Sequence, residues 1–311
     1  APAASGAPAQ DQGQAPAQPQ AQGQPQQGQP AQGAPAQGQP GQPRPGQPVV
    51  EELYGKLPMR PTMEAAEGIR FDFCEGLRIQ TPEKGGPWRV MFRDMDTGVI
   101  LYSQDVGPGV YITSVKKFFV RFKLEIFHTA DMEAYGEKIK ANPSLVEDKS
   151  LQPKPFFVHE YNAEGKTVMI QAPVPTLGDT FGWFPYCERF QKKHKCHVIA
   201  VLQPQFIEVL QKQYPDMTFI TKDKVPECEP YACYYLGLFF RGEVDHQPCD
   251  FRYVGLHKTA GYILGVDTSD CMPKFDLSAP RKIKEPYVCI AAQSSSQAKY
   301  WNNPRGWQDV V

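Results

Sequence analysis

The sequence predicts an α/β fold with an added all-β domain, in which a small antiparallel β-barrel or sandwich precedes a region of alternating strands and helices. Three observations predict this fold class. Residues 1–48 are almost entirely Ala, Pro, Gln and Gly, so the folded part of the 311-residue chain follows them. Residues 69–128 form short strand-like runs divided by turn residues. From about residue 157, apolar strand-like runs alternate with helix-like segments.

The first segment, residues 1–48, carries Asp11 and Arg44 as its only charged side chains. Such a composition offers too little apolar surface to offset the conformational entropy of the chain, so we expect a disordered tail without chemistry of its own. We assign residues 49–156 to the β-domain and its connecting segment, and residues 157–311 to the α/β domain.

The predicted β-domain rests on alternation along its strands. The run Phe118–Phe127 is the clearest, because its alternate residues divide into an apolar face and a largely charged face, as in a sheet with one buried and one solvated side. Shorter strand-like runs precede it at 69–73, 88–93 and 99–102. The residues Asp96–Gly98 are a plausible hairpin turn, and a polar connection with a short helix around 131–140 follows the β-domain.

The α/β domain is predicted from strands that alternate with helices. We expect strands at 167–172, 196–202, 217–220, 234–240 and 286–292. We expect helices at about 180–194, 204–213 and 258–266. The last residues, 307–311, resemble the opening of a further helix, which indicates a sequence that ends inside a domain. Pro185 disturbs the first helix: either the regular helix begins near Pro185, or the helix is bent there.

The turn Pro175–Asp179 is the first place where we expect chemistry. It joins the strand at 167–172 to an aromatic helix, and open α/β sheets bind ligands at the carboxyl ends of such strands. Thr176 and Gly178 support the turn. Asp179 has two interpretations: it caps the helix and favours the helix dipole, with Thr176 sharing the capping, or it is a general base that takes a proton from an acceptor hydroxyl.

A second polar run, Gln293–Lys299, follows the strand predicted at 286–292 and therefore also lies at the carboxyl end of a strand. Its serine hydroxyls, among them those of Ser294 and Ser295, make a plausible cradle for a diphosphate, with Lys299 as a point charge. The alternative is a polar loop with a solvated lysine, since the run matches no P-loop spacing.

Charge and cysteine usage limit the partners and cofactors that we expect. A net charge of −1 gives no reason to expect nucleic acid, and no apolar run is long enough to span a bilayer. Eight cysteines without paired spacing predict reduced thiols in a cytoplasmic protein. The run His194–His197 contains metal-ligand residue types, but we favour a polar helix end before a buried strand and expect no metal site. We interpret His257 as a hydrogen-bonded structural histidine.

Five stretches occur in the order found in a known protein family. They are Lys116–Phe122, Thr176–Asp179 with Gly182–Tyr186, Gly261–Asp267, Leu277–Arg281 and Gln297–Asn303. Because these matches are long and ordered, the chain from about residue 68 onward resembles the autotransporter heptosyltransferases, cytoplasmic bacterial enzymes related to the lipopolysaccharide heptosyltransferases.

The resemblance implies a fold, a reaction and the residues of a site. The fold is the amino-terminal, Rossmann-like half of a GT-B glycosyltransferase, preceded by a β-domain. The reaction transfers heptose from ADP-heptose to Ser and Thr hydroxyls of an autotransporter adhesin. The catalytic aspartate of the family matches Asp179, and its donor-side lysine matches Lys299. Ser294 and Ser295 match the hydroxyls that hold the donor phosphates in related enzymes.

Two departures from the family pattern shape the remaining expectations. The tail at 1–48 is not part of that pattern. The second nucleotide-binding domain is missing, residues 286–311 lead into it, and the iron-binding cysteine motif of the family lies there. We therefore expect no cofactor in this chain, a chain that is incomplete for activity alone, and homo-oligomerisation only as a property of the family. Two alternatives remain open: a lipopolysaccharide-core acceptor, or a non-catalytic protein- or glycan-binding module.

Overall fold

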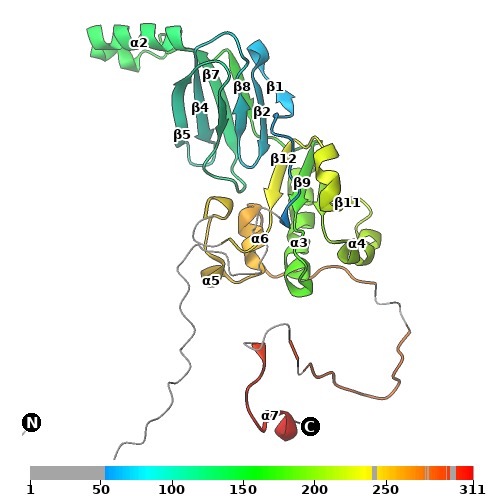
Figure 1. The fold of residues 1–311 in the computed structure, drawn as a ribbon. Helices are drawn as coiled ribbons and strands as arrows, with labels where there is room; N and C mark the ends of the chain where they lie inside the picture. The colour runs from blue at the N-terminus through cyan, green and yellow to red at the C-terminus, as the bar shows by residue number, and fades with distance from the viewer. Residues whose placement is uncertain are drawn as a thin grey trace, which may run out of the picture. The chain divides into compact units, whose positions relative to one another are not determined.

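The computed structural model describes residues 53–239, 244–276, 278, 280–291, 293–294 and 299–310. Two sheets organise these residues (Figure 1). One is an eight-stranded mixed sheet and the other is a four-stranded antiparallel sheet, so the predicted combination of an α/β region with an antiparallel region is confirmed. The tail predicted to be disordered, residues 1–48, lies outside the described residues.

The mixed sheet contains five neighbouring parallel strands. In spatial order they are β11 (Thr218–Ile220), β10 (His197–Val201), β9 (Thr167–Gln171), β12 (Ala232–Tyr235) and β2 (Arg70–Cys74). The antiparallel strands β3 (Arg78–Gln80) and β6 (Tyr111–Thr113) continue the sheet beyond β2, and β1 (Met63–Glu64) also pairs with β2. The sheet therefore crosses the boundary at residue 156 that we assigned from the sequence.

The antiparallel sheet packs against strand β2 of the mixed sheet. Its order is β5 (Ile100–Val106), β4 (Trp88–Asp94), β7 (Phe122–His128) and β8 (Phe157–Glu160). The ring centroid of Phe71 lies 5.4 Å from that of Phe157 and 4.8 Å from that of His159. The ring centroids of Phe73 and Tyr161 lie 5.0 Å apart. These rings form an aromatic core between the two sheets.

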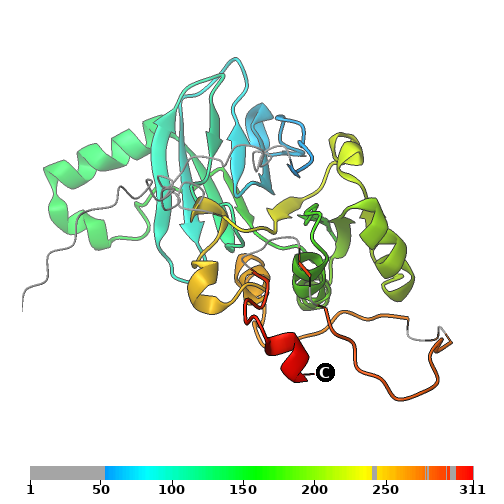
Figure 2. The same cartoon turned by 60° about the horizontal axis from the view of Figure 1, so that its bottom comes forward.

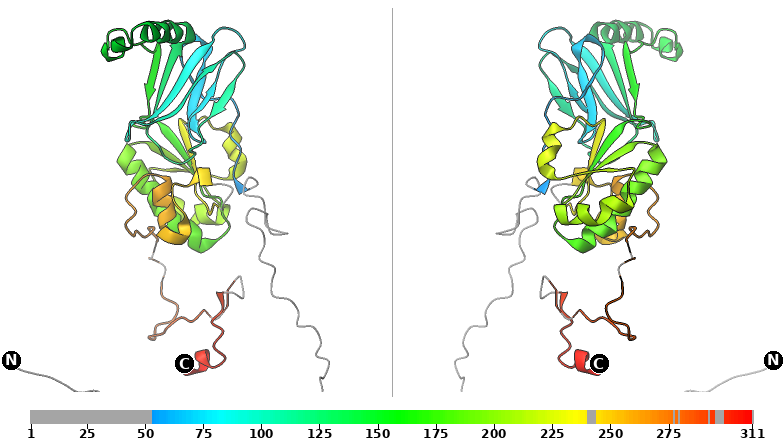
Figure 3. Two further views of the ribbon diagram at one scale, coloured as in Figure 1. Left: turned by 90° about the vertical axis from the view of Figure 1, so that its left-hand side faces the viewer. Right: turned by 90° about the vertical axis from the view of Figure 1, so that its right-hand side faces the viewer.

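The helices follow the predicted order. They are α2 (Thr129–Ala141), α3 (Leu177–His194), α4 (Pro204–Leu210), α5 (Phe251–Val254), α6 (Lys258–Ile263) and α7 (Gly306–Val310), with short 3-10 turns at Ala66–Gly68, Pro143–Glu147, Gln211–Gln213, Lys222–Glu227 and Val244–His246. Figures 2 and 3 show α6 beside α3. None of the helices in the described part of the chain has the length and apolar character needed to cross a bilayer.

Helix α3 is the longest helix and is anchored by its aromatic face. Trp183, Phe184, Tyr186 and Phe190 are fully buried, so the middle of the helix is fixed in the core. The helix begins at Leu177 and contains Pro185 in its interior, so the interpretation that the regular helix starts near Pro185 is wrong. Burial of this face offsets the cost of an interior proline.

The predicted strand Phe118–Phe127 is correct only in its second half, since β7 begins at Phe122. The Phe119 N–H donates to the Ile263 carbonyl at 2.8 Å, and its ring lies 5.0 Å from that of His194. A tertiary contact with the end of α6 thus replaces strand pairing. Likewise, the strand predicted at 234–240 is displaced, because β12 covers Ala232–Tyr235.

The strand predicted at 286–292 is wrong over its described part. Residues 286–291 form no strand and are exposed, with Val288 at 86% exposure. No described strand pairs with these residues, and an apolar run without a pairing partner leaves its backbone groups to water. The polar run that follows therefore does not begin at the carboxyl end of a sheet strand in this structure.

Candidate active site

The turn after β9 lies at the carboxyl end of a strand that has parallel neighbours on both sides. The Ala172 N–H donates to the Val201 carbonyl at 2.9 Å, which ties the start of the turn to the end of β10. The Gln203 side chain donates to the Pro173 carbonyl at 2.6 Å. Two contacts from the next strand therefore hold the turn that leads into α3.

Asp179 is half-buried in the first turn of α3, which begins at Leu177, three residues before the start predicted near residue 180. Its carboxylate accepts a short hydrogen bond from the Thr176 hydroxyl. Thr176 is the N-cap residue, but its side chain makes no hydrogen bond to a helix N–H, so its predicted share in capping is not seen. A carboxylate that is held by one hydroxyl and partly open to solvent has free lone pairs for a ligand proton.

The surface at Gly178, in the same helical turn, is open. A Cβ atom added at Gly178 would meet no other group within 4 Å, and the backbone there is helical, so Gly178 is not required for a special conformation. Further along α3, a Cβ atom at Gly182 would lie 3.2 Å from the Cβ atom of His257. The helix is therefore packed tightly at Gly182 and open at Gly178.

The residues that precede α6 pack against helix α3. The Trp183 indole N–H donates to the Leu256 carbonyl at 2.9 Å. The His257 ring lies 2.9 Å from a carboxylate oxygen of Asp270, which confirms that His257 is hydrogen-bonded. This bond is the first cause that holds the pKa of Asp270 below its usual range. These contacts hold the amino-terminal half of α3 against the segment that precedes α6.

The segment before β1 also lies at this edge of the sheet, which the sequence did not predict. The buried Gln171 side chain, at the end of β9, accepts from the Gly55 N–H at 2.8 Å and donates to the Gly55 carbonyl at 3.1 Å. The Tyr54 hydroxyl donates to the Leu236 carbonyl at 2.8 Å. The only sequence signal for this arrangement is a glutamine within an apolar strand.

The described residues of the second predicted group make no contact with this turn by a hydrogen bond or an ion pair. Lys299 is exposed, Ser294 is half-exposed, and Ser295 lies outside the described residues. Within the described part of the chain, no hydrogen bond or ion pair joins Asp179 to Lys299 or Ser294. The structure thus positions the Asp179 turn in detail and brings no donor-side group to it.

The predicted helix end before a buried strand is confirmed at His194–His197. Helix α3 ends at His194, Lys195 adopts the left-handed conformation that ends helices, and β10 begins at His197. The described residues contain no group of three or more His, Cys, Asp and Glu side chains that could hold a metal ion.

Comparison with known proteins places the chain beside a group of bacterial glycosyltransferases. A family model described as the N-terminal domain of glycosyltransferase TibC matches residues 65–130. Autotransporter heptosyltransferase TibC of Escherichia coli O78:H11 is 45% identical over 82% of the chain. BAHTCr of Citrobacter rodentium, with the same description, is 43% identical over 82% of the chain. An inactive autotransporter heptosyltransferase, BimC of Burkholderia thailandensis, is 38% identical over 80% of the chain.

Solved structures agree with these relatives. The crystal structure of the iron-containing dodecameric glycosyltransferase TibC from enterotoxigenic E. coli superimposes with a TM-score of 0.71 at 43% identity, covering 82% of this chain and 60% of that chain. The structure of TibC in complex with ADP-D-beta-D-heptose gives a TM-score of 0.72 at 42% identity, covering 83% and 61%. The chain spans 57% of the length of TibC, 56% of BAHTCr and 53% of BimC.

Proposed function

The chain belongs to the autotransporter heptosyltransferase family, and from this premise we propose that the protein transfers heptose from ADP-heptose to Ser and Thr hydroxyls of an autotransporter protein. The support for the donor is the ADP-heptose complex of a relative with 42% identity. The observation that carries the proposal is the half-buried Asp179 carboxylate, which lies in the turn beyond the carboxyl end of β9 and accepts one hydroxyl hydrogen bond, so that lone pairs stay free for a proton.

The proposed step has a simple proton balance. The acceptor hydroxyl oxygen forms a bond to the anomeric carbon of heptose, the bond from that carbon to the diphosphate oxygen breaks, and ADP leaves with the bonding electron pair. Asp179 takes the hydroxyl proton, which is the work of a positioned general base. The Thr176 hydroxyl orients the carboxylate by donating to one of its oxygens.

We assign the donor-phosphate contacts to Lys299, Ser294 and Ser295. A lysine ammonium and two hydroxyls suit the charge that develops on the leaving diphosphate. No hydrogen bond or ion pair among the described residues joins Lys299 or Ser294 to Asp179, so the assignment requires that these side chains come closer to Asp179 in the active protein. We propose that they do so in the Rossmann-like arrangement of a GT-B enzyme, completed by the region that the longer relatives have in addition.

The proposals for iron and assembly rest on the relatives, and the proposal for the compartment rests on the sequence. A related structure is described as iron-containing and dodecameric. The described residues offer no cluster that fits a metal ion, so we derive no step through iron and assign it to the additional region of the relatives. We propose homo-oligomeric assembly, and a cytoplasmic location because the sequence predicts reduced thiols.

The test is transfer of radiolabelled heptose from ADP-heptose to the autotransporter acceptor by the full-length protein. Asp179→Asn removes the base, whereas Asp131→Asn alters an exposed carboxylate in the first turn of α2 and is the matched control. We expect transfer by the control and loss of transfer by Asp179→Asn, with donor binding retained in both. Equal transfer by the two variants contradicts the assignment of the base.

A second candidate function is non-catalytic binding of protein or glycan. It is favoured by one observation, the description of the BimC relative as inactive. A non-catalytic protein would bind the autotransporter partner but would neither hydrolyse nor transfer ADP-heptose. Transfer of label by the unmodified full-length protein excludes this function.

A further inference from the structure

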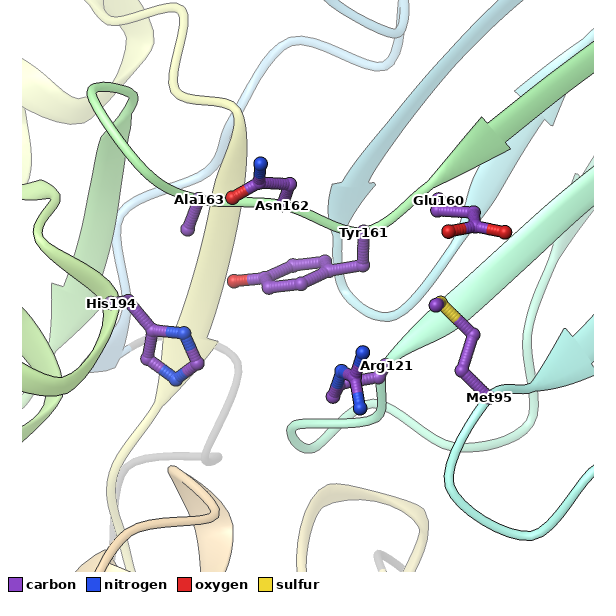
Figure 4. Close-up of a pocket in the computed structure, with 7 residues that line it drawn as sticks. All are labelled: Met95, Arg121, Glu160, Tyr161, Asn162, Ala163 and His194. Carbon is purple, nitrogen blue, oxygen red and sulfur yellow. The ribbon is translucent and has the colours of Figure 1, made fainter.

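Two adjoining hollows lie at the carboxyl end of α3, at the opposite end of the helix from Asp179. Their volumes are about 420 and 520 Å³, both are open to solvent, and they share Arg121 and His194. Figure 4 shows the first hollow, with the Tyr161 ring between His194 on one side and Arg121 on the other. The remaining lining residues are Met95, Glu160, Asn162 and Ala163 in the first hollow, and Asp96, Phe119, Lys193 and Gly265 in the second.

His194 presents a buried nitrogen without a partner at this place. Its ring is held between Phe119 and Phe190, with centroid distances of 5.0 and 4.3 Å. The Nε2 atom is buried and has no hydrogen-bond partner among the described residues. Burial lowers the pKa of His194 to about 4, so the imidazole is neutral near pH 7. A buried polar atom without a partner is destabilising, and a ligand or water that displaces a neighbouring side chain would satisfy it.

The other side chains supply both donors and acceptors. Arg121 donates through one terminal nitrogen to Asp96 at 2.6 Å, which leaves further N–H groups on its guanidinium. The Asn162 side-chain oxygen accepts from the Glu164 N–H at 3.0 Å, which leaves the amide NH₂ as a donor. The Glu160 carboxylate is an exposed acceptor. Two cations and two carboxylates line the hollows, so their charges balance.

This chemistry favours an uncharged, elongated ligand with alternating donors and acceptors. A phosphate ligand would be opposed by the carboxylates of Asp96 and Glu160, and a purely apolar ligand would strand the polar groups. A small-molecule site normally encloses most of its ligand, whereas these hollows are open and adjoin each other at Arg121 and His194. An extended polypeptide, with an N–H and a carbonyl in every residue, meets these conditions.

We propose that the hollows around Arg121 and His194 form a docking site for an extended segment of the protein acceptor, remote from the residue that is glycosylated. The inference rests on the proposed function for the identity of the partner. His194 lies fifteen residues after Asp179 on one helix, so the two points are about 22 Å apart at about 1.5 Å per residue. About seven extended residues span this distance.

Binding of the fluorescently labelled acceptor by the full-length protein, measured by anisotropy without donor, tests the proposal. Arg121→Ala is expected to raise the Kd by about tenfold or more, as for a charged group at the centre of an interface. Arg89→Ala is the matched control, since Arg89 is an arginine on strand β4 that pairs with Asp105 at 2.6 Å and lines neither hollow. Equal Kd values for the two variants overturn the docking site.

His194→Leu separates docking from a structural role. It removes the unpartnered nitrogen and keeps an apolar side chain between the rings, so we expect an unchanged or higher melting temperature together with weaker acceptor binding. A lower melting temperature with unchanged acceptor affinity assigns His194 to the core and overturns the proposal.

Two further readouts keep this proposal distinct from the function itself. Arg121→Ala should hydrolyse ADP-heptose and modify a short acceptor peptide as the unmodified protein does, because neither reaction uses the hollows. If the unmodified protein binds the acceptor but never transfers heptose, the proposed function fails and the docking site stands. If free heptose or an oligosaccharide displaces the acceptor and an unmodified peptide does not, the docking site is wrong, because its ligand is then a sugar.

Discussion

The two ends of helix α3 differ in almost every physical respect. The amino end is polar and open: Leu177 is 62% exposed, and the Asp179 carboxylate is held by a single hydroxyl. At the carboxyl end, the His194 ring is wedged between aromatic rings with one nitrogen unpartnered. The open end suits a reactive group that meets a small acceptor hydroxyl, and the wedged end suits a fixed contact with a longer partner.

The middle of the helix makes this difference useful. Because Trp183, Phe184 and Phe190 are buried, the middle of the helix is held rigidly in the core. A group at one end therefore keeps a constant distance from a group at the other. Variants that alter one end of α3, or that destabilise the whole helix, test this comparison.

The largest expected effect is at the amino end. Asp179→Asn keeps the size of the side chain and removes its capacity to take a proton, so kcat should fall by about 10²–10⁴. The measurement is steady-state heptose transfer at saturating donor and acceptor. Acceptor affinity should stay unchanged, because it is assigned to the other end of the helix. A fall in acceptor affinity without a fall in kcat would reverse the assignment.

A substitution that destabilises the middle of α3 should affect both ends of the helix. Trp183→Ala removes a fully buried indole and its hydrogen bond to the Leu256 carbonyl, so it should lower the free energy of unfolding by about 3–5 kcal/mol. Urea denaturation followed by circular dichroism measures this change. Leu177→Ala on the same helix alters an exposed side chain and should cost less than about 0.5 kcal/mol. Similar losses in the two variants would mean that α3 is not anchored through its middle.

A smaller effect is expected from the hydroxyl that holds the carboxylate. Thr176→Val should reduce kcat/KM by about tenfold, or about 1.4 kcal/mol, because Asp179 loses a hydrogen bond to a charged group. Thr176→Ser keeps the hydroxyl and should restore the rate. If the serine variant is as slow as the valine variant, the hydroxyl does not orient the base.

The smallest effect is a pH dependence from the carboxyl end. The pKa of His194 is lowered to about 4 in the folded protein, mainly by burial. Between about pH 6.5 and pH 4 the unfolded chain therefore binds a proton that the folded protein does not. Stability is therefore fully present above about pH 6.5 and falls as the pH drops toward 4. Partial exposure of the ring limits the loss to about 1–2 kcal/mol. Thermal unfolding of the His194→Leu protein should lack this part of the slope, and an identical slope would contradict burial as the cause.

The sequence predicts β9, β10 and β11 close to their observed positions, but it assigns β2 to the β-domain and starts α3 near residue 180 instead of at Leu177. Strands buried on both faces are continuous apolar runs, and β9 and β10 have this pattern. The location of Asp179 at the start of the helix follows from the same pattern. The role of Asp179 as a base stays a prediction, since the resemblance to a family supplied it and no contact tests it.

Features that depend on distant partners were not predictable. Residues 286–291 and β9 are both apolar, but only β9 has neighbours to pair with. Phe119 leaves its strand because Ile263 offers a backbone partner. The hollows at His194 also escaped prediction, because they combine residues from Met95 to Gly265 and no local pattern shows that these distant segments meet.

The dependence of acceptor binding on peptide length tests the central claim most directly, which is that one helix separates the reacting hydroxyl from a docking site by about 22 Å. Acceptor peptides are lengthened stepwise on either side of one modified serine, and KM for transfer is measured with the unmodified protein and with Arg121→Ala. We predict that KM falls by about tenfold once the peptide extends beyond about seven residues, and that Arg121→Ala shows no such fall. A KM that does not change with length, or the same fall in both proteins, would contradict this claim.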